Sequence, residues 1–179
     1  MKSLLLALPL LALAAPGAAE TILAGNLITD AASDAMGPAT ILIEDGRIVS
    51  ITRGIDRAAA GADVIDLSDK TVLPGLIDTH VHLTGDPGGD FWKEATEPAE
   101  WGVMVGVKNA LKTVKAGFTT VREAGSAGQT AFVLRRGIDE GMVPGPRIVA
   151  AGPPLAIIGG HGDVSGFLPE VNDLLSSGF

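Results

Sequence analysis

The pattern of apolar and polar residues changes character near Pro74. Before that point the apolar residues form short runs typical of strands, which we predict over 21–28, 41–44, 47–51 and 63–67. Asp45-Gly46 separates two of these runs and predicts a hairpin, because its backbone preferences suit the twist of paired strands. This segment holds no convergent polar cluster, so we assign no chemistry to it.

After Pro74 the spacing predicts alternating strands and helices. Leu76 and Ile77 indicate a strand buried on both faces, entered through the turn Pro74-Gly75. Apolar residues then recur at helical spacing over 98–114 and 132–138, each time before a further apolar strand, at 116–123 and 145–152. The order strand, helix, strand, helix, strand predicts a parallel sheet of the α/β class.

Two imidazoles follow the first of these strands closely. His80 and His82 are separated by Val81, and alternate residues of a strand face the same side, about 6 to 7 Å apart by the rise per residue. Sheets and barrels of this class place their chemistry at the carboxyl ends of strands. The pair therefore predicts half of a divalent-metal site. A lone His-x-His is also typical of structural or surface imidazoles.

The segment 74–83, Pro-Gly-Leu-Ile-Asp-Thr-His-Val-His-Leu, resembles the first barrel strand of the amidohydrolase superfamily. Residues 116–123 and 145–152 resemble the second and third strands, and the loop 158–162 resembles one found in imidazolonepropionase-like and Xaa-Pro-dipeptidase-like members. The resemblance implies the N-terminal half of a (β/α)8 TIM barrel, preceded by a small β-sandwich-like domain. On this basis residues 20–73 are part of the small β-domain, and residues 74–179 are the first part of the barrel, truncated after about three strands.

The resemblance also implies the site. His80 and His82 are expected to bind one or two divalent ions, with zinc as the expected metal, and His161 is expected to bind substrate, the alternative being an ordinary loop histidine. We assign no catalytic residue, because the family's bridging carboxylated Lys, two further His ligands and general base Asp lie on later strands. Arg122 and Glu123 are expected to form an ion pair of mainly structural role, with Glu123 in place of the Asp of many relatives.

Composition limits the kinds of molecule and metal ligand to be expected. The 179 residues include 13 Lys and Arg against 21 Asp and Glu, a net charge of -8, which argues against a nucleic-acid partner. The absence of Cys leaves any metal to be bound by His, carboxylate or modified Lys.

The N-terminus predicts export. Lys2 precedes an apolar run over 4–15, and small residues lead to Ala19, which is the pattern of a signal peptide over 1–19. We therefore expect a periplasmic or secreted protein that is free of the membrane after cleavage. An uncleaved anchor or a buried helix is the alternative.

The expected function is hydrolysis of carbon–nitrogen bonds of the amide or peptide type by a metal-dependent enzyme. An exported dipeptidase or N-acyl amino acid hydrolase, seen as an N-terminal fragment, fits best, so the expected partner is a small molecule such as a dipeptide; oligomerisation stays open. The residues from Pro74 onward are far fewer than the roughly 250 of such a barrel. The alternatives are a truncated, inactive exported product that associates with a partner half, and a secreted binding module that uses the β-domain.

Overall fold

The computed structural model describes residues 19–58, 63–88 and 96–157, together with 160, 168 and 170. The chain divides into two compact units, Met1–Pro74 and Gly75–Phe179. His161 and the predicted signal peptide, apart from Ala19, lie outside the described residues.

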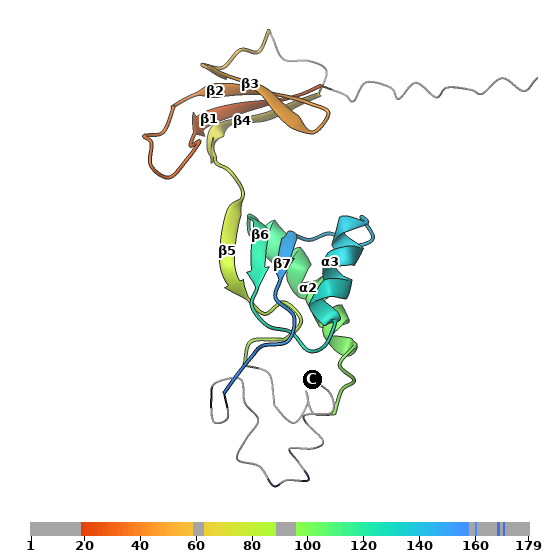
Figure 1. The fold of residues 1–179 in the computed structure, drawn as a ribbon. Coiled ribbons are helices and arrows are strands. Elements are labelled where there is room, and N and C mark those ends of the chain that lie inside the picture. Colours follow the sequence, from red (N-terminus) through yellow and green to blue (C-terminus); the bar gives the residue numbers. More distant parts are fainter. Residues whose placement is uncertain are drawn as a thin grey trace, which may run out of the picture. The chain divides into compact units, whose positions relative to one another are not determined.

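The first unit contains a four-stranded sheet in the order β3-β2-β1-β4 (Figure 1). Its strands are β1 (Glu20–Leu27), β2 (Ala39–Glu44), β3 (Arg47–Arg53) and β4 (Asp63–Val72). β2 pairs antiparallel with β1 and β3, whereas β4 runs parallel to β1. The described residues of this unit form one sheet, so the second layer of the expected sandwich is not among them.

The predicted hairpin between β2 and β3 is confirmed. Asp45 and Gly46 have φ angles of 51° and 70°, the left-handed conformation that a two-residue turn of this kind requires. On β1, Gly25 lies at an irregularity of the β1–β4 ladder, where a Cβ would come within 2.2 Å of the carbonyl oxygen of Ser68. A larger residue there would force the two strands apart.

The second unit confirms the predicted parallel sheet. Strands β5 (Leu76–Val81), β6 (Phe118–Glu123) and β7 (Arg147–Ala150) lie side by side in parallel, in the order β5-β6-β7. Helices α2 (Trp101–Lys115) and α3 (Thr130–Asp139) connect them and pack on the sheet (Figure 1). α2 ends before Gly117, whose φ of 95° reverses the chain into β6.

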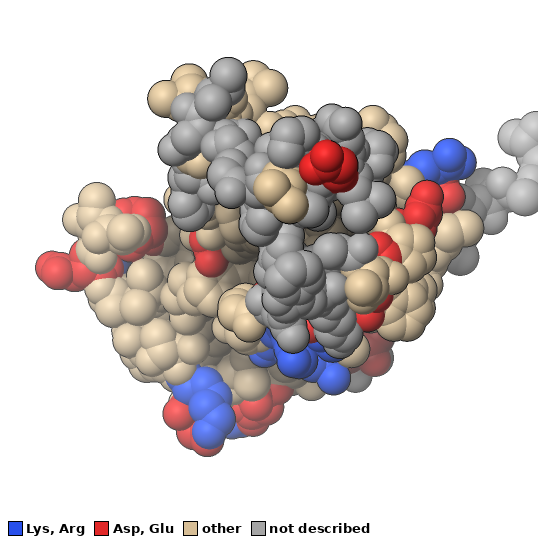
Figure 2. Space-filling model, turned by 90° about the horizontal axis from the view of Figure 1, so that it is seen from below, with Lys and Arg blue, Asp and Glu red and all other residues tan. Residues whose placement is uncertain are grey.

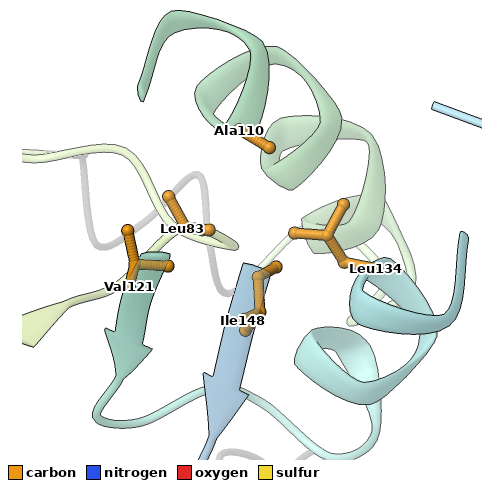
Figure 3. Close-up of a cluster of buried hydrophobic side chains, with 5 residues drawn as sticks. All are labelled: Leu83, Ala110, Val121, Leu134 and Ile148. Carbon is orange, nitrogen blue, oxygen red and sulfur yellow. The ribbon is translucent and has the colours of Figure 1, made fainter. Parts of the chain in front are cut away.

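The core of the second unit lies between this sheet and its helices. Figure 3 shows five buried apolar side chains converging from β6, β7, α2, α3 and the turn after β5: Leu83, Ala110, Val121, Leu134 and Ile148. Gly106 lets the helices approach closely, since a Cβ there would lie 2.7 Å from Cδ2 of Leu134. Through Leu83, the turn that follows the two imidazoles packs into this core.

One prediction about β5 is wrong. Leu76 and Ile77 were expected to be buried on both faces, yet they are 43% and 66% exposed. β5 is an edge strand of the described three-stranded sheet, so it has a neighbouring strand on one side only. An apolar run indicates a strand, but its burial depends on what packs beside it.

The charged surface is mixed. On the face shown in Figure 2, Lys and Arg side chains lie largely beside Asp and Glu. Ion pairs among the described residues include Lys108 with Asp86 and Arg136 with Glu140. Within the described ranges, no helix has the length and apolar character needed to cross a bilayer.

Candidate metal centre

The end of β5 is not a regular strand. In the ladder with β6, Asp78 lies opposite Val121 and Val81 lies opposite Glu123, so β5 has an extra residue between these pairs. The N–H of His80, in this interval, donates to Oδ1 of Asp78 at 3.0 Å. Bulges of this kind re-aim side chains and often occur beside active sites.

The bulged segment brings the two imidazoles together. Nε2 of His80 lies 3.3 Å from Nε2 of His82, with the ring planes inclined by 74°. Two nitrogens bound to one tetrahedral zinc at about 2.0–2.1 Å would be about 3.3–3.4 Å apart. The donor pair therefore fits a divalent ion. In its absence, the same approach suits a weak hydrogen bond from one ring to the other.

A backbone carbonyl sets the tautomer of His82. Nδ1 of His82 lies 2.9 Å from the carbonyl oxygen of Gly125. Because a carbonyl can only accept, Nδ1 carries the proton and Nε2 keeps the lone pair that a metal requires. A Cβ at Gly125 would lie 3.4 Å from Cε1 of His82 and 3.3 Å from Cβ of Pro154, so glycine permits this close approach.

A buried carboxylate lies behind the same imidazole. Glu123 is 0% exposed; its Oε2 accepts a 2.6 Å hydrogen bond from the N–H of Leu83, and its Oε1 lies 3.7 Å from Nδ1 of His82. Among the described residues, Oε1 has no hydrogen-bond partner. Burial raises the pKa of Glu123, while the N–H groups of Leu83 and Gly125 and the two imidazoles act in the opposite direction.

The expected ion pair between Arg122 and Glu123 is wrong. Arg122 is exposed and Glu123 is buried, because adjacent residues of a strand face opposite sides, and no ion pair between described residues joins them. The sequence carried a signal for this arrangement. Val121 and Glu123 are two residues apart and share the buried face of β6.

Helix α2 holds the turn that follows the imidazoles. Nδ2 of Asn109 donates to the carbonyl oxygens of Leu83 and Gly85, at 3.0 and 3.1 Å. Nζ of Lys108 lies 2.6 Å from Oδ2 of Asp86, and this pairing, followed by the contact with Asn109, lowers the pKa of the Asp86 carboxyl. The backbone after His82 is thus fixed from two sides, by β6 and by α2.

The described residues supply two candidate metal ligands, His80 and His82. Within the part of the chain that the structure describes, no group of three or more His, Cys, Asp or Glu side chains could hold an ion. A catalytic zinc normally has three protein ligands, so a complete site needs donors beyond His80 and His82.

Comparison with known proteins identifies the family. A model of the amidohydrolase family matches residues 71–177, so the chain belongs to this family, as the strand motifs predicted. The match includes the imidazole pair, Glu123 and the described βαβαβ unit. Members of the family typically depend on divalent metals.

Particular relatives are similar over different parts of the chain. A dihydroorotase of Bacillus cytotoxicus is 41% identical over 81 residues, which are 45% of this chain and 16% of that protein. The crystal structure of a Xaa-Pro dipeptidase with bound methionine in the active site is similar over 86% of this chain, with 35% identity and a TM-score of 0.77. A prolidase complexed with N-methylphosphonate-L-proline is similar over 90%, with 29% identity and a TM-score of 0.70.

The chain is much shorter than these proteins. It spans 38% of the dipeptidase chain and 39% of the prolidase chain. The mixed α/β fold of the described residues is therefore similar to part of an amidohydrolase barrel.

Proposed function

We propose that this chain belongs to a metal-dependent hydrolase that cleaves carbon–nitrogen bonds of small molecules, with His80 and His82 holding a divalent ion. The observation that supports it best is the 3.3 Å approach of the two Nε2 atoms, combined with the Nδ1 contact of His82 to Gly125. The Gly125 contact leaves the lone pair on Nε2 of His82, and the two Nε2 atoms lie at the spacing that one ion requires. Zinc is the metal we propose, since imidazole nitrogen is among its preferred ligands.

The described residues orient and support this site. When bound, the ion would polarise the scissile carbonyl and activate a water molecule for attack. Gly125 holds His82 in the ligating tautomer, and Asp78 satisfies the N–H of His80 within the bulge. His80 lies near the carboxyl end of β5 and His82 directly follows the strand, at the edge where parallel α/β proteins leave room for a substrate.

The substrate class we propose is a dipeptide or an N-acyl amino acid. The crystal structure of the Xaa-Pro dipeptidase is similar over 86% of this chain, with 35% identity, which supports this class. The prolidase neighbour, solved with a proline derivative, supports the same class. We keep His161 as the residue proposed to bind substrate, with an ordinary loop histidine as the alternative.

We also propose export, which rests on the apolar run after Lys2 and the small residues before Glu20. N-terminal sequencing of the mature protein from each cell fraction tests this. A mature chain that begins near Glu20 and lies outside the cytoplasm supports export. A chain that retains Met1-Lys2 contradicts it.

The metal-site experiment compares three variants of the full-length protein. We expect His80→Ala and His82→Ala each to lose bound zinc and hydrolysis of Xaa-Pro dipeptides, whereas His161→Ala keeps zinc and raises KM. Dihydroorotate and N-acyl amino acids serve as comparison substrates. Faster turnover of dihydroorotate than of the others would contradict the proposed substrate class. Full activity after chelation, or an unchanged zinc content in both His80→Ala and His82→Ala, contradicts the site. Zinc binding without any hydrolysis favours the inactive product that needs a partner half.

A further inference from the structure

We propose that Glu123 is a positioning residue for His82. Its buried carboxylate holds the imidazole with the proton on Nδ1 and with Nε2 directed toward His80. The role deepens the proposed metal site and rests on it only for the metal-binding part of the test. Glu123 itself is not proposed to touch the ion or the substrate.

The first argument is burial. Glu123 is 0% exposed on a strand whose neighbouring inward residue, Val121, belongs to the apolar core. A carboxylate at such a position is costly unless charge or hydrogen bonds compensate it. The N–H of Leu83 donates to Oε2, and the N–H of Gly125 also favours the charged carboxylate. Oε1 has no hydrogen bond of normal geometry among the described residues, and the imidazole of His82 lies 3.7 Å from it.

The second argument is that the two oxygens act on consecutive residues. The 2.6 Å bond from Leu83 to Oε2 is short, as expected for a hydrogen bond to a charged acceptor, and it fixes the backbone directly after His82. Oε1 lies on the Nδ1 edge of the ring, where negative charge favours a proton. One side chain thus fixes the backbone after His82 and reinforces the tautomer that the Gly125 carbonyl favours.

The third argument concerns the other contact of the ring. The Gly125 carbonyl accepts the hydrogen bond from Nδ1, and Gly125 follows Glu123 by two residues on the same chain segment. The end of β6 therefore provides both an acceptor and a negative charge for one imidazole edge. Carboxylate or carbonyl partners of this kind orient metal-binding histidines and raise their basicity.

The test begins with the metal-free, full-length protein. Nitrogen-15 NMR of the imidazoles at about pH 8.5, where histidine is ordinarily neutral, reports which ring nitrogen of His82 carries the proton. We expect the Nδ1–H form in the wild-type protein. Glu123→Gln removes the negative charge beside Nδ1, so we expect a shift toward the Nε2–H form. Glu140→Gln is the matched control, because it removes an exposed carboxylate that pairs with Arg136.

A Zn²⁺ titration of the same proteins gives the second readout. Loss of a partner that orients a ligating imidazole typically weakens metal binding by about 10–100-fold, and we expect that loss in Glu123→Gln but not in Glu140→Gln. Glu123→Asp keeps the charge and should recover part of the affinity. If Glu123→Gln does not fold, Glu123→Asp carries the test, with an intermediate tautomer population expected.

The outcomes separate the two proposals. An unchanged His82 tautomer and an unchanged Zn²⁺ affinity in a folded Glu123→Gln or Glu123→Asp variant overturn the positioning role. A wild-type protein that binds no Zn²⁺, but whose His82 tautomer depends on Glu123, contradicts the proposed metal function and supports the positioning role.

Discussion

Gly106 and Leu134 provide a sharp test of how α2 packs against α3. A Cβ at Gly106 would lie 2.7 Å from Cδ2 of Leu134 and 3.3 Å from Cγ2 of Thr84. Leu134 is 1% exposed within the apolar core, so its side chain has little room to move away. The substitution Gly106→Ala should therefore have opposite effects on stability in the presence and absence of the leucine side chain.

The expected magnitudes follow from these contacts. In the wild-type background, overpacking costs about 1–3 kcal/mol. Alanine is favoured over glycine inside a helix by roughly 0.5–1 kcal/mol. We therefore expect Gly106→Ala to lower the free energy of unfolding by up to about 2.5 kcal/mol. Leu134→Ala alone should lower it by about 2–5 kcal/mol. In the Leu134→Ala background the clash is removed, so Gly106→Ala should raise it, with a coupling of about 1–3 kcal/mol between the two sites.

Urea unfolding followed by tryptophan fluorescence measures this cycle, since both tryptophans belong to the second unit. Gly137→Ala is the control. Its Cβ would meet only Cγ2 of Val143, at an ordinary 3.7 Å, so it should be equally favourable in both backgrounds. If Gly106→Ala changes the free energy of unfolding equally in both backgrounds, the close approach of the helices through Gly106 is refuted.

Three further predictions concern the turn, an ion pair and the metal. Gly46→Ala should lower the free energy of unfolding by about 1–2 kcal/mol, because φ is positive at this position. Gly85→Ala is the control and should be neutral, since a Cβ at Gly85 meets open space. Urea unfolding followed by circular dichroism compares the two variants, and equal effects would refute the turn argument. The Ser68 hydrogen bond and Arg57 lower the pKa of Asp66 to about 2 from 3.8. The stabilisation relative to Asp66→Asn should therefore be present above pH 3.8 and lost as the pH falls toward about 2, and a difference that grows on acidification contradicts this. Zn²⁺ at about a hundred times its Kd should raise the free energy of unfolding by about 2.7 kcal/mol, and chelation should reverse the increase; a melting temperature unaffected by Zn²⁺ contradicts binding to the folded state.

Features with a local cause were predictable from the sequence. Asp45-Gly46 marks a hairpin because the turn depends on the conformations of those two residues. The apolar stripe that includes Ala110 predicted a helix, and the apolar runs on either side of it predicted strands. The spacing of apolar residues distinguishes the helical period from the strand period, so the parallel βαβαβ order could be predicted. The prediction that His80 and His82 face the same side also came from local spacing.

Features that depend on distant partners were not predictable. The 3.3 Å approach of His80 and His82 depends on a bulge that appears only when β5 pairs with β6. The burial of Glu123 depends on the N–H of Leu83, and the exposure of Ile77 on the edge position of β5. Alternation within 118–123 indicated the buried side of Glu123, but not the group that it would meet there.

The hydrogen bond from Leu83 to Glu123 joins residues 40 positions apart, which bears on when the site can form. Closing a loop of that length costs roughly 3 kcal/mol of chain entropy, so the bond forms only together with the β5–β6 pairing that shares this cost. On a ribosome that adds about 5–20 residues per second, the segment with both imidazoles emerges roughly 2–8 s before its buried carboxylate. During that interval the nascent chain carries two histidines without a fixed tautomer or a fixed spacing. Under the proposed metal role, tight binding of an ion would therefore wait until the first βαβ unit has folded.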